Sequence, residues 1–210
     1  MLNELENGDK VCQLKKALYG LRQAERCWYE RIDKELAKYG AKKSSADPCT
    51  YHKGEGDSRL LICVYVDDIL VASRNREEIV NFGRYLSKVF ETTDLGVAKY
   101  CLCMEFSQSK GEITICQAAY VKDILERFGM ENSKAVSTPS EPGTKLGVSA
   151  EQPSLEEEEL PYRKLVGALM YLSVCTRPDI SYAVSYLSQF NSYFRSEHWV
   201  AAKRVLTGSF

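Results

Sequence analysis

The stretch from Leu60 to Ala72 constrains the fold of this chain more than any other segment, because two adjacent carboxylates interrupt an otherwise apolar run. Residues 60–66 and 69–73 have the β-branched and apolar composition of strands, so the segment predicts a β-hairpin with Asp67 and Asp68 at its tip. The interruption also excludes a transmembrane helix here, since such a helix needs about 20 apolar residues.

The carboxylate pair has two physical explanations. An exposed polar turn would keep both charges in water, although Asp-Asp is a poor match to the Asn-Gly or Asp-Gly preference of two-residue hairpin loops. A bound divalent cation would neutralise the pair, and hard carboxylate oxygens suit Mg²⁺. The residues around Asp67 and Asp68 are apolar on both sides, and the spacing alone favours neither explanation.

The periodicity elsewhere alternates between helices and strands up to about residue 136. Apolar residues three or four apart predict helices at residues 24–39, 76–90 and 121–128. Two more strands are predicted at residues 99–106 and 112–116. Asn75 is placed to cap the second helix and Gly129 to end the third. The first part of the chain therefore has the pattern of an α+β domain.

An acidic segment separates this domain from a helical one. Residues 141–160 carry six Glu against one Lys, together with prolines and glycines, which is typical of a linker. From residue 161 onward the periodicity is helical. Arg177-Pro178-Asp179 breaks one helix and starts the next, and Ser196 is placed to cap the last.

The net charge of −1 conceals a basic stretch near the N-terminus. From Lys10 to Lys43, ten basic residues stand against four acidic ones, a local balance of +6. Such a run is either a solvated face or a phosphate-binding surface. The N-terminus lacks the basic region and apolar core of a signal peptide, so we expect an intracellular location, cytoplasmic or nuclear, and no secretion. The eight cysteines are then expected to be reduced, small buried hydrophobic residues.

The residues Tyr65-Val66-Asp67-Asp68 resemble the signature of reverse transcriptases, and six further blocks resemble copia-type retrotransposon polymerases in the same order. These blocks are Leu14–Gln23 (with Arg26 and Trp28 following), Phe90–Gly96, Gln117–Leu125, Thr138–Pro139, Tyr162–Tyr171 and Thr176–Ile180. The resemblance implies an α+β palm-type antiparallel sheet with packed helices in residues 1–136, a linker in residues 137–160, and a small helical thumb in residues 161–210. It also implies that the fingers and the first palm strand are missing.

The same resemblance implies a catalytic site. Asp67 would bind both ions of a two-metal centre and Asp68 would support it, with Mg²⁺ as the cofactor and Mn²⁺ as the alternative ion. Tyr65 would lie beside the primer terminus, and Gln23 would line the pocket of the incoming nucleotide. Further contacts to substrate or primer are implied at Lys15, Lys16, Arg22 and Met104.

The implied partners are an RNA template, a DNA primer and deoxynucleoside triphosphates, with no membrane. Other portions of the Pol polyprotein, or another chain, are further implied partners.

Departures from the family pattern affect this expectation. Cys103 stands where glycine is usual, and Glu25 stands where proline is usual. The third catalytic carboxylate of the family belongs to an apolar strand upstream of Leu14, whereas the acidic residues there lie in a polar stretch, at Glu4, Glu6 and Asp9. We therefore expect this polypeptide to be weak or inactive as a polymerase on its own. The alternative is a catalytically inert remnant that acts as a nucleic-acid-binding or protein-interaction module.

Overall fold

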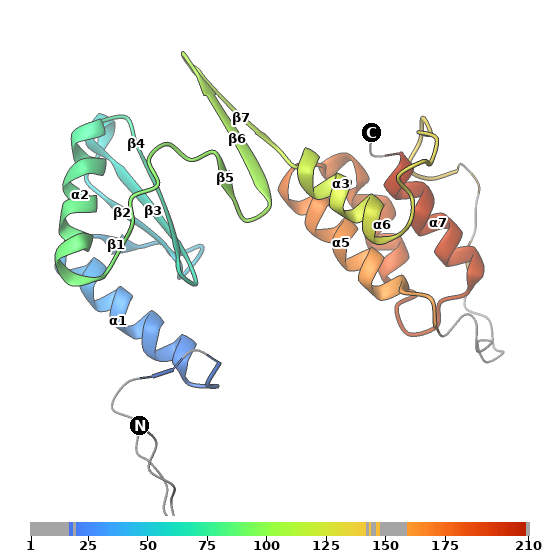
Figure 1. The fold of residues 1–210 in the computed structure, drawn as a ribbon, viewed down its shortest axis with the longest axis horizontal. Coiled ribbons are helices and arrows are strands. Elements are labelled where there is room, and N and C mark those ends of the chain that lie inside the picture. Colours follow the sequence, from blue (N-terminus) through green and yellow to red (C-terminus); the bar gives the residue numbers. More distant parts are fainter. Residues whose placement is uncertain (1–16, 19, 142, 144–145, 148–158, 209–210) are drawn as a thin grey trace, which may run out of the picture. The chain divides into compact units, whose positions relative to one another are not determined.

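The computed structural model describes residues 17–18, 20–141, 143, 146–147 and 159–208 (Figure 1). The chain divides into two compact units, Met1–Gly96 and Val97–Phe210. Each unit has a hydrophobic core of its own. Both units contain an antiparallel sheet and α-helices, so the fold is mixed α and β as predicted. The predicted division into functional segments at residues 136 and 160 stays a prediction.

The first unit is a four-stranded antiparallel sheet with two helices (Figure 1). Its strands follow the order β1 (Lys42–Lys43), β2 (Thr50–Lys53), β3 (Leu60–Tyr65) and β4 (Asp68–Ser73). A short 3-10 turn, η1 (Gly56–Ser58), precedes β3, and the helices are α1 (Ala24–Lys38) and α2 (Arg76–Val89). The Asn75 side chain accepts a hydrogen bond from the Glu77 N–H at 2.9 Å, which confirms the predicted N-cap.

Strand β3 has one buried and one exposed side. Leu60, Ile62 and Val64 are buried in a core that includes residues of both helices, because alternate residues of a strand point to opposite faces. Leu61, Cys63 and Tyr65 are exposed on the opposite face. We call this surface the open face, and it comprises these three residues and their paired neighbours Thr50, His52, Asp68, Leu70 and Ala72.

The second unit combines a small sheet with a helical core. Its strands are β5 (Tyr100–Cys101), β6 (Met104–Ser109) and β7 (Glu112–Cys116), and its helices are α3 (Ala118–Arg127), α5 (Tyr162–Cys175), η2 (Pro178–Ile180), α6 (Ser181–Ser188) and α7 (Ser196–Thr207). Fully buried Leu165, Leu169 and Leu172 form the centre of the core on α5. Among the described residues, no helix is long and apolar enough to cross a membrane.

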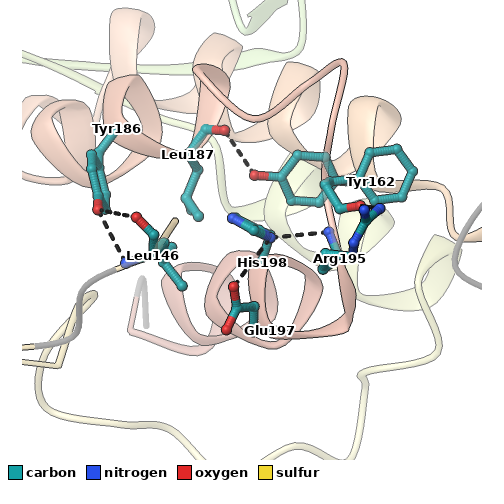
Figure 2. Close-up of polar contacts among 8 residues, drawn as sticks. Leu146, Tyr162, Tyr186, Leu187, Arg195, Glu197 and His198 are labelled. Atoms are coloured by element: carbon teal, nitrogen blue, oxygen red, sulfur yellow. Dashed lines mark hydrogen bonds and ion pairs between the residues drawn. The ribbon is translucent and has the colours of Figure 1, made fainter. Parts of the chain in front are cut away.

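Polar contacts fix the ends of these helices to one another (Figure 2). The Tyr162 hydroxyl donates to the Leu187 carbonyl at 2.7 Å, which joins α5 to α6. The Arg195 N–H donates to Nδ1 of His198 at 3.0 Å, and His198 is fully buried. The predicted cap at Ser196 is therefore wrong by one residue: Arg195 is the N-cap of α7, and an imidazole accepts its N–H.

The prediction that the cysteines are small buried residues is wrong for the seven that the structure describes. Cys27, Cys63 and Cys116 are exposed, and the others are partly exposed, at Cys49, Cys101, Cys103 and Cys175. The apolar neighbours in the sequence were misleading, because Cys63 occupies an outward position of the alternating strand β3. Cys12 lies outside the described residues.

The segment Thr176–Ile180 connects α5 to α6 and contains an ion pair with two hydrogen bonds. The Arg177 guanidinium donates to both carboxylate oxygens of Asp179, at 2.9 and 2.7 Å. Hydrogen bonding from Arg177 holds the pKa of the Asp179 carboxyl below its ordinary value. Thr176 also donates to the Gln117 side chain at 2.8 Å, so this segment is connected to the start of α3.

The Asp179 carboxylate should contribute stability that depends on pH. Because its pKa is lower in the folded chain than in the unfolded one, the contribution is complete above the unfolded pKa and is lost as pH falls through the folded pKa. Asp179→Asn should therefore lower the free energy of unfolding by no more than about 1 kcal/mol at pH 7, as expected for a pair whose carboxylate side chain is 57% exposed. Urea denaturation of both proteins from pH 7 to pH 2.5 measures this, and a difference that persists at pH 2.5 contradicts it.

Candidate active site

The hairpin of β3 and β4 turns one residue earlier than the sequence suggested. Tyr65 pairs with Asp68, so the two-residue loop is Val66-Asp67 and Asp68 already belongs to β4. Val66 has φ +50°, whereas Asp67 is not among the described residues with positive φ. This is the pattern of a type II′ turn, whose first loop residue is normally glycine. A β-branched residue there is strained, at a cost on the order of 1–3 kcal/mol.

Both aspartates are exposed at this tip. Tyr65 is 59% exposed and is paired with Asp68, so both belong to the end of the open face. Because the carboxylates remain in water, folding of the hairpin does not require a cation to neutralise them. The predicted hairpin is confirmed, and it brings Tyr65, Asp67 and Asp68 together.

The donor set at the tip fits a magnesium ion that arrives with a phosphate ligand. Mg²⁺ usually keeps several waters and is bound through one or two carboxylates together with substrate phosphates. Asp67 and Asp68 supply two carboxylates. In the described part of the chain, no group of three or more His, Cys, Asp or Glu side chains is arranged to hold a metal.

The other predicted site residues are only partly described. Gln23 is the N-cap residue of α1 and Arg22 precedes it, and both side chains are exposed. Met104 begins β6 in the second unit and is partly buried. Lys15 and Lys16 lie outside the described residues.

Trp28 is a residue of this site whose contact the sequence did not indicate. Its indole Nε1 donates to the carbonyl of Val66 at 2.6 Å, across 38 positions of the chain. The sequence placed Trp28 only on the apolar stripe of a helix. Its position within a family block was the single signal available before the structure, and that signal does not specify a partner.

Much of the basic stretch is engaged in local ion pairs. On α1, Arg26 contacts Glu30 at 2.9 Å, and Glu35 contacts both Arg31 at 3.9 Å and Lys38 at 2.8 Å. Lys43 contacts Asp33 at 2.9 Å. Hydrogen bonds from Lys43 and Tyr51 hold the pKa of the Asp33 carboxyl below its ordinary value. Within the described residues, the exposed cations of this stretch outside those ion pairs are Arg22, Lys34 and Lys42.

A second hairpin has an unusual loop as well. The predicted strand at residues 99–106 is wrong, because a turn at Leu102 and Cys103 divides it into β5 and β6. Both loop residues have positive φ, +50° and +57°, as in a type I′ turn. The hydroxyl of Tyr171 on α5 donates to the Leu102 carbonyl. Cys103, the departure noted in the sequence, therefore occupies a left-handed position that favours glycine.

Cys103→Gly should stabilise the second unit. Glycine removes the left-handed penalty of about 1–2 kcal/mol. Part of this benefit is lost, because glycine gives the unfolded chain more conformational entropy, so a net stabilisation of about 1 kcal/mol is expected. An increase in the midpoint of urea denaturation measures it. Cys116→Gly in β7 is the control, because its φ is not positive and glycine should destabilise a strand there. A lower midpoint for Cys103→Gly would contradict the strain argument.

Comparisons with known proteins identify the family of this chain. The profile of the family described as "Reverse transcriptase (RNA-dependent DNA polymerase)" matches residues 2–142. The chain is 38% identical over 203 residues to the Retrovirus-related Pol polyprotein from transposon TNT 1-94 of Nicotiana tabacum, a match that covers 93% of the chain. It is also 38% identical over 196 residues to the corresponding polyprotein from transposon RE1 of Arabidopsis thaliana, again over 93% of the chain.

The matched relatives differ greatly in length. The chain spans 15% of the tobacco polyprotein and 13% of the Arabidopsis one. It is 33% identical over 201 residues to the putative transposon Ty5-1 protein YCL074W of Saccharomyces cerevisiae, where the match covers 95% of the chain and 65% of that protein. No solved structure gives a significant match. The chain belongs to the reverse transcriptase (RNA-dependent DNA polymerase) family, and its relatives are copia-type Pol polyproteins of retrotransposons.

Proposed function

We propose that this chain supplies palm and thumb elements of a copia-type reverse transcriptase, which adds deoxynucleotides to a primer 3′-hydroxyl on an RNA template. The observation that carries the proposal is the β3–β4 hairpin, which brings Tyr65, Asp67 and Asp68 together at the end of the open face. The opposite face of the sheet is covered by the two helices. Family membership supports the reaction class and the need for a divalent metal and a nucleic-acid template. An intracellular location is part of the proposal.

In this proposal each site residue has a defined task. Asp67 and Asp68 would hold Mg²⁺, or Mn²⁺ in its place, and the metal would supply charge stabilisation at the reacting phosphate. Tyr65 would contact the primer terminus, because its exposed ring belongs to the same face as Asp68. Gln23 would contact the incoming nucleotide, and Arg22 the phosphates. The second unit, through Met104 and the helices from α5 onward, would hold the primer-template duplex.

The edge position of β4 supports the expectation of weak activity. In the described sheet β4 pairs with β3 alone, so its other edge beside Asp68 is available to a further strand. A strand that paired there would run alongside Asp68 and would be able to deliver a third carboxylate to the two-metal site. With only the two carboxylates that the described residues bring to the tip, the reacting groups would be less well positioned, and a displacement of about 1 Å costs on the order of 100-fold in rate.

A catalytically inert nucleic-acid-binding module is the second candidate. The observation that favours it is the set of exposed cations outside the local ion pairs, Arg22, Lys34 and Lys42. In that case the open face and the exposed cations would still bind a duplex, without incorporation of nucleotides.

Two assays on the purified chain separate these candidates. Fluorescence anisotropy with an RNA–DNA hybrid duplex measures binding, and primer extension with Mg²⁺ or Mn²⁺ measures incorporation. We expect salt-sensitive binding and little incorporation. Robust templated incorporation would overturn the expected weakness, and absence of binding at low salt would overturn both candidate functions. Asp67→Asn is the control that should remove any incorporation and leave duplex binding in place.

The exposed cations Arg22, just before α1, and Arg26, on α1, should contribute unequally to binding. Each phosphate contact adds about −0.9 to the slope of log affinity against log salt concentration. Arg22→Ala should therefore reduce the magnitude of that slope by about one. Arg26→Ala is the matched control, because the Arg26 guanidinium is already paired with Glu30. Equal slopes for wild type and Arg22→Ala would show that Arg22 contacts no phosphate.

A further inference from the structure

The loop of the β3–β4 hairpin accepts a hydrogen bond from a helix that is not part of the sheet. The Val66 carbonyl lies in the two-residue loop, beyond the last pair of the ladder, Tyr65 with Asp68. Its hydrogen-bond donor is the indole Nε1 of Trp28 on α1, at 2.6 Å. The bond thus connects a helix to the peptide group that joins Val66 to Asp67.

The indole itself is fixed by a second helix. The Trp28 ring meets the Phe90 ring edge to face, with centroids 5.3 Å apart and planes at 70°. Phe90 is the C-cap residue of α2, and its N–H donates to the Leu86 carbonyl at 2.8 Å. The Arg31 guanidinium lies 5.8 Å from the centre of the same Phe90 ring. The donor that holds the loop is therefore anchored to both helices of the first unit.

The orientation of one peptide group decides where Asp67 points. Two-residue hairpin loops occur mainly as type I′ or type II′ turns, which differ by a rotation of the peptide between the two loop residues. Positive φ occurs at both residues in type I′ and at the first alone in type II′. Val66 has positive φ and Asp67 does not, so the loop is of type II′.

Asp67 by itself is compatible with either turn. Aspartate tolerates the left-handed conformation better than most residues, so the type I′ form is open to it. Rotation of the peptide to that form would turn the Val66 carbonyl away from Trp28 and break the bond. The indole N–H therefore favours the form in which Asp67 keeps negative φ.

We propose that Trp28 is a positioning residue: its indole N–H fixes the Val66–Asp67 peptide in the type II′ orientation and so sets the direction of the Asp67 carboxylate. The expected effect of Trp28 on metal binding rests on the proposed function. The expected effect of Trp28 on the loop peptide does not depend on the proposed function.

The second hairpin offers an internal comparison. There the loop residues Leu102 and Cys103 both have positive φ, and the Leu102 carbonyl accepts from the Tyr171 hydroxyl. Each loop thus has its central carbonyl held by an aromatic side chain of a helix in its own unit. Tyr171→Phe removes the equivalent donor and is the matched control for Trp28→Phe.

The first arm of the test needs no metal. NMR of the isotopically labelled chain records the Val66 carbonyl carbon and the Asp67 amide in wild type and both variants. Trp28→Phe should shift or broaden these two signals and leave those of Leu102 and Cys103 in place, whereas Tyr171→Phe should do the reverse. If Trp28→Phe fails to fold, a benzothienyl-alanine at position 28 keeps the two-ring shape and lacks the N–H. Unchanged Val66 and Asp67 signals without the donor would overturn the inference.

The second arm measures Mn²⁺ affinity by the electron paramagnetic resonance signal of the free ion. Residues that orient a metal ligand typically contribute 10–100-fold to metal affinity, so Trp28→Phe should weaken binding about tenfold. Tyr171→Phe should bind Mn²⁺ as wild type does. An equal loss in both variants would overturn the inference, since it would indicate general destabilisation. If wild type binds no Mn²⁺, the proposed metal role of Asp67 fails, and the first arm alone decides the role of Trp28.

Discussion

Asp67→Asn should weaken Mn²⁺ binding by about 100-fold. Coulomb's law gives about 2–4 kcal/mol between a divalent cation and one carboxylate charge 2–4 Å away in water, which corresponds to about 30- to 1000-fold in affinity. The water value applies because both Asp67 and Asp68 are exposed. Titration of the chain with Mn²⁺, followed by the resonance of the free ion, measures the change.

The control for this prediction is another exposed aspartate of the same unit. Asp57 is 82% exposed and its carboxylate is paired with Arg74 at 2.9 Å, so Asp57→Asn should leave Mn²⁺ affinity at the wild-type value. Asn at position 67 keeps the size of the side chain and its tolerance of turn conformations. An Asp67→Asn variant that folds and binds Mn²⁺ as tightly as wild type would show that Asp67 is not a ligand.

The second large effect concerns stability. Leu169 is fully buried at the centre of α5 in the core of the second unit, and Leu169→Ala should lower the free energy of unfolding by about 2–5 kcal/mol, because it removes buried surface and leaves a cavity. The loss should appear in the second unit. Labelling with 5-fluorotryptophan gives one ¹⁹F signal per unit, since Trp28 belongs to the first unit and Trp199 to the second. Urea titration of each signal measures the two transitions.

Val174→Ala provides the matched comparison on the same helix. Val174 is 76% exposed, so its truncation should change the free energy of unfolding by less than about 0.5 kcal/mol. If both variants shifted the Trp199 transition equally, the core assigned to α5 would be wrong.

The sequence was sufficient for elements whose local signals agree. The helix α2 has an N-cap at Asn75, acidic residues in its first turn and an apolar stripe that ends in buried Phe82 and Leu86, so its existence and start were both predictable. Gly129 has φ +63° just after α3, as expected for a residue that ends a helix. In these elements the periodicity and the terminal residues indicate the same structure.

Two of the errors occur where a residue adopts a conformation that its type disfavours. Val66, Leu102 and Cys103 have positive φ, and no propensity rule places a turn at a valine or at Leu-Cys. Periodicity and composition missed the loop at Val66-Asp67 and the division of the strand at 99–106 for this reason. Both loops have a central carbonyl that accepts from an aromatic side chain far away in the chain, and such long-range contacts cannot be inferred from local sequence.

The family signature marks the residues of the candidate site, but it does not give their environment. The family signature identified Tyr65, Asp67 and Asp68, whereas their exposure depends on which face of β3 the helices cover. The charge count from Lys10 to Lys43 likewise did not show that Glu30, Asp33 and Glu35 pair with the neighbouring cations. Charge along a sequence predicts a surface only where the side chains of opposite sign are far apart.

The alternation of buried and exposed residues along β3 leaves a cysteine thiol exposed on the open face, where it can report on a bound duplex. Cys63 is exposed on the open face, two residues before Tyr65 on the same side of the strand. A duplex that covers this face should slow alkylation of the exposed Cys63 thiol relative to its rate in the chain without duplex. Occupancy of the open face then becomes measurable by mass spectrometry on the unmodified sequence, whether or not any nucleotide is incorporated.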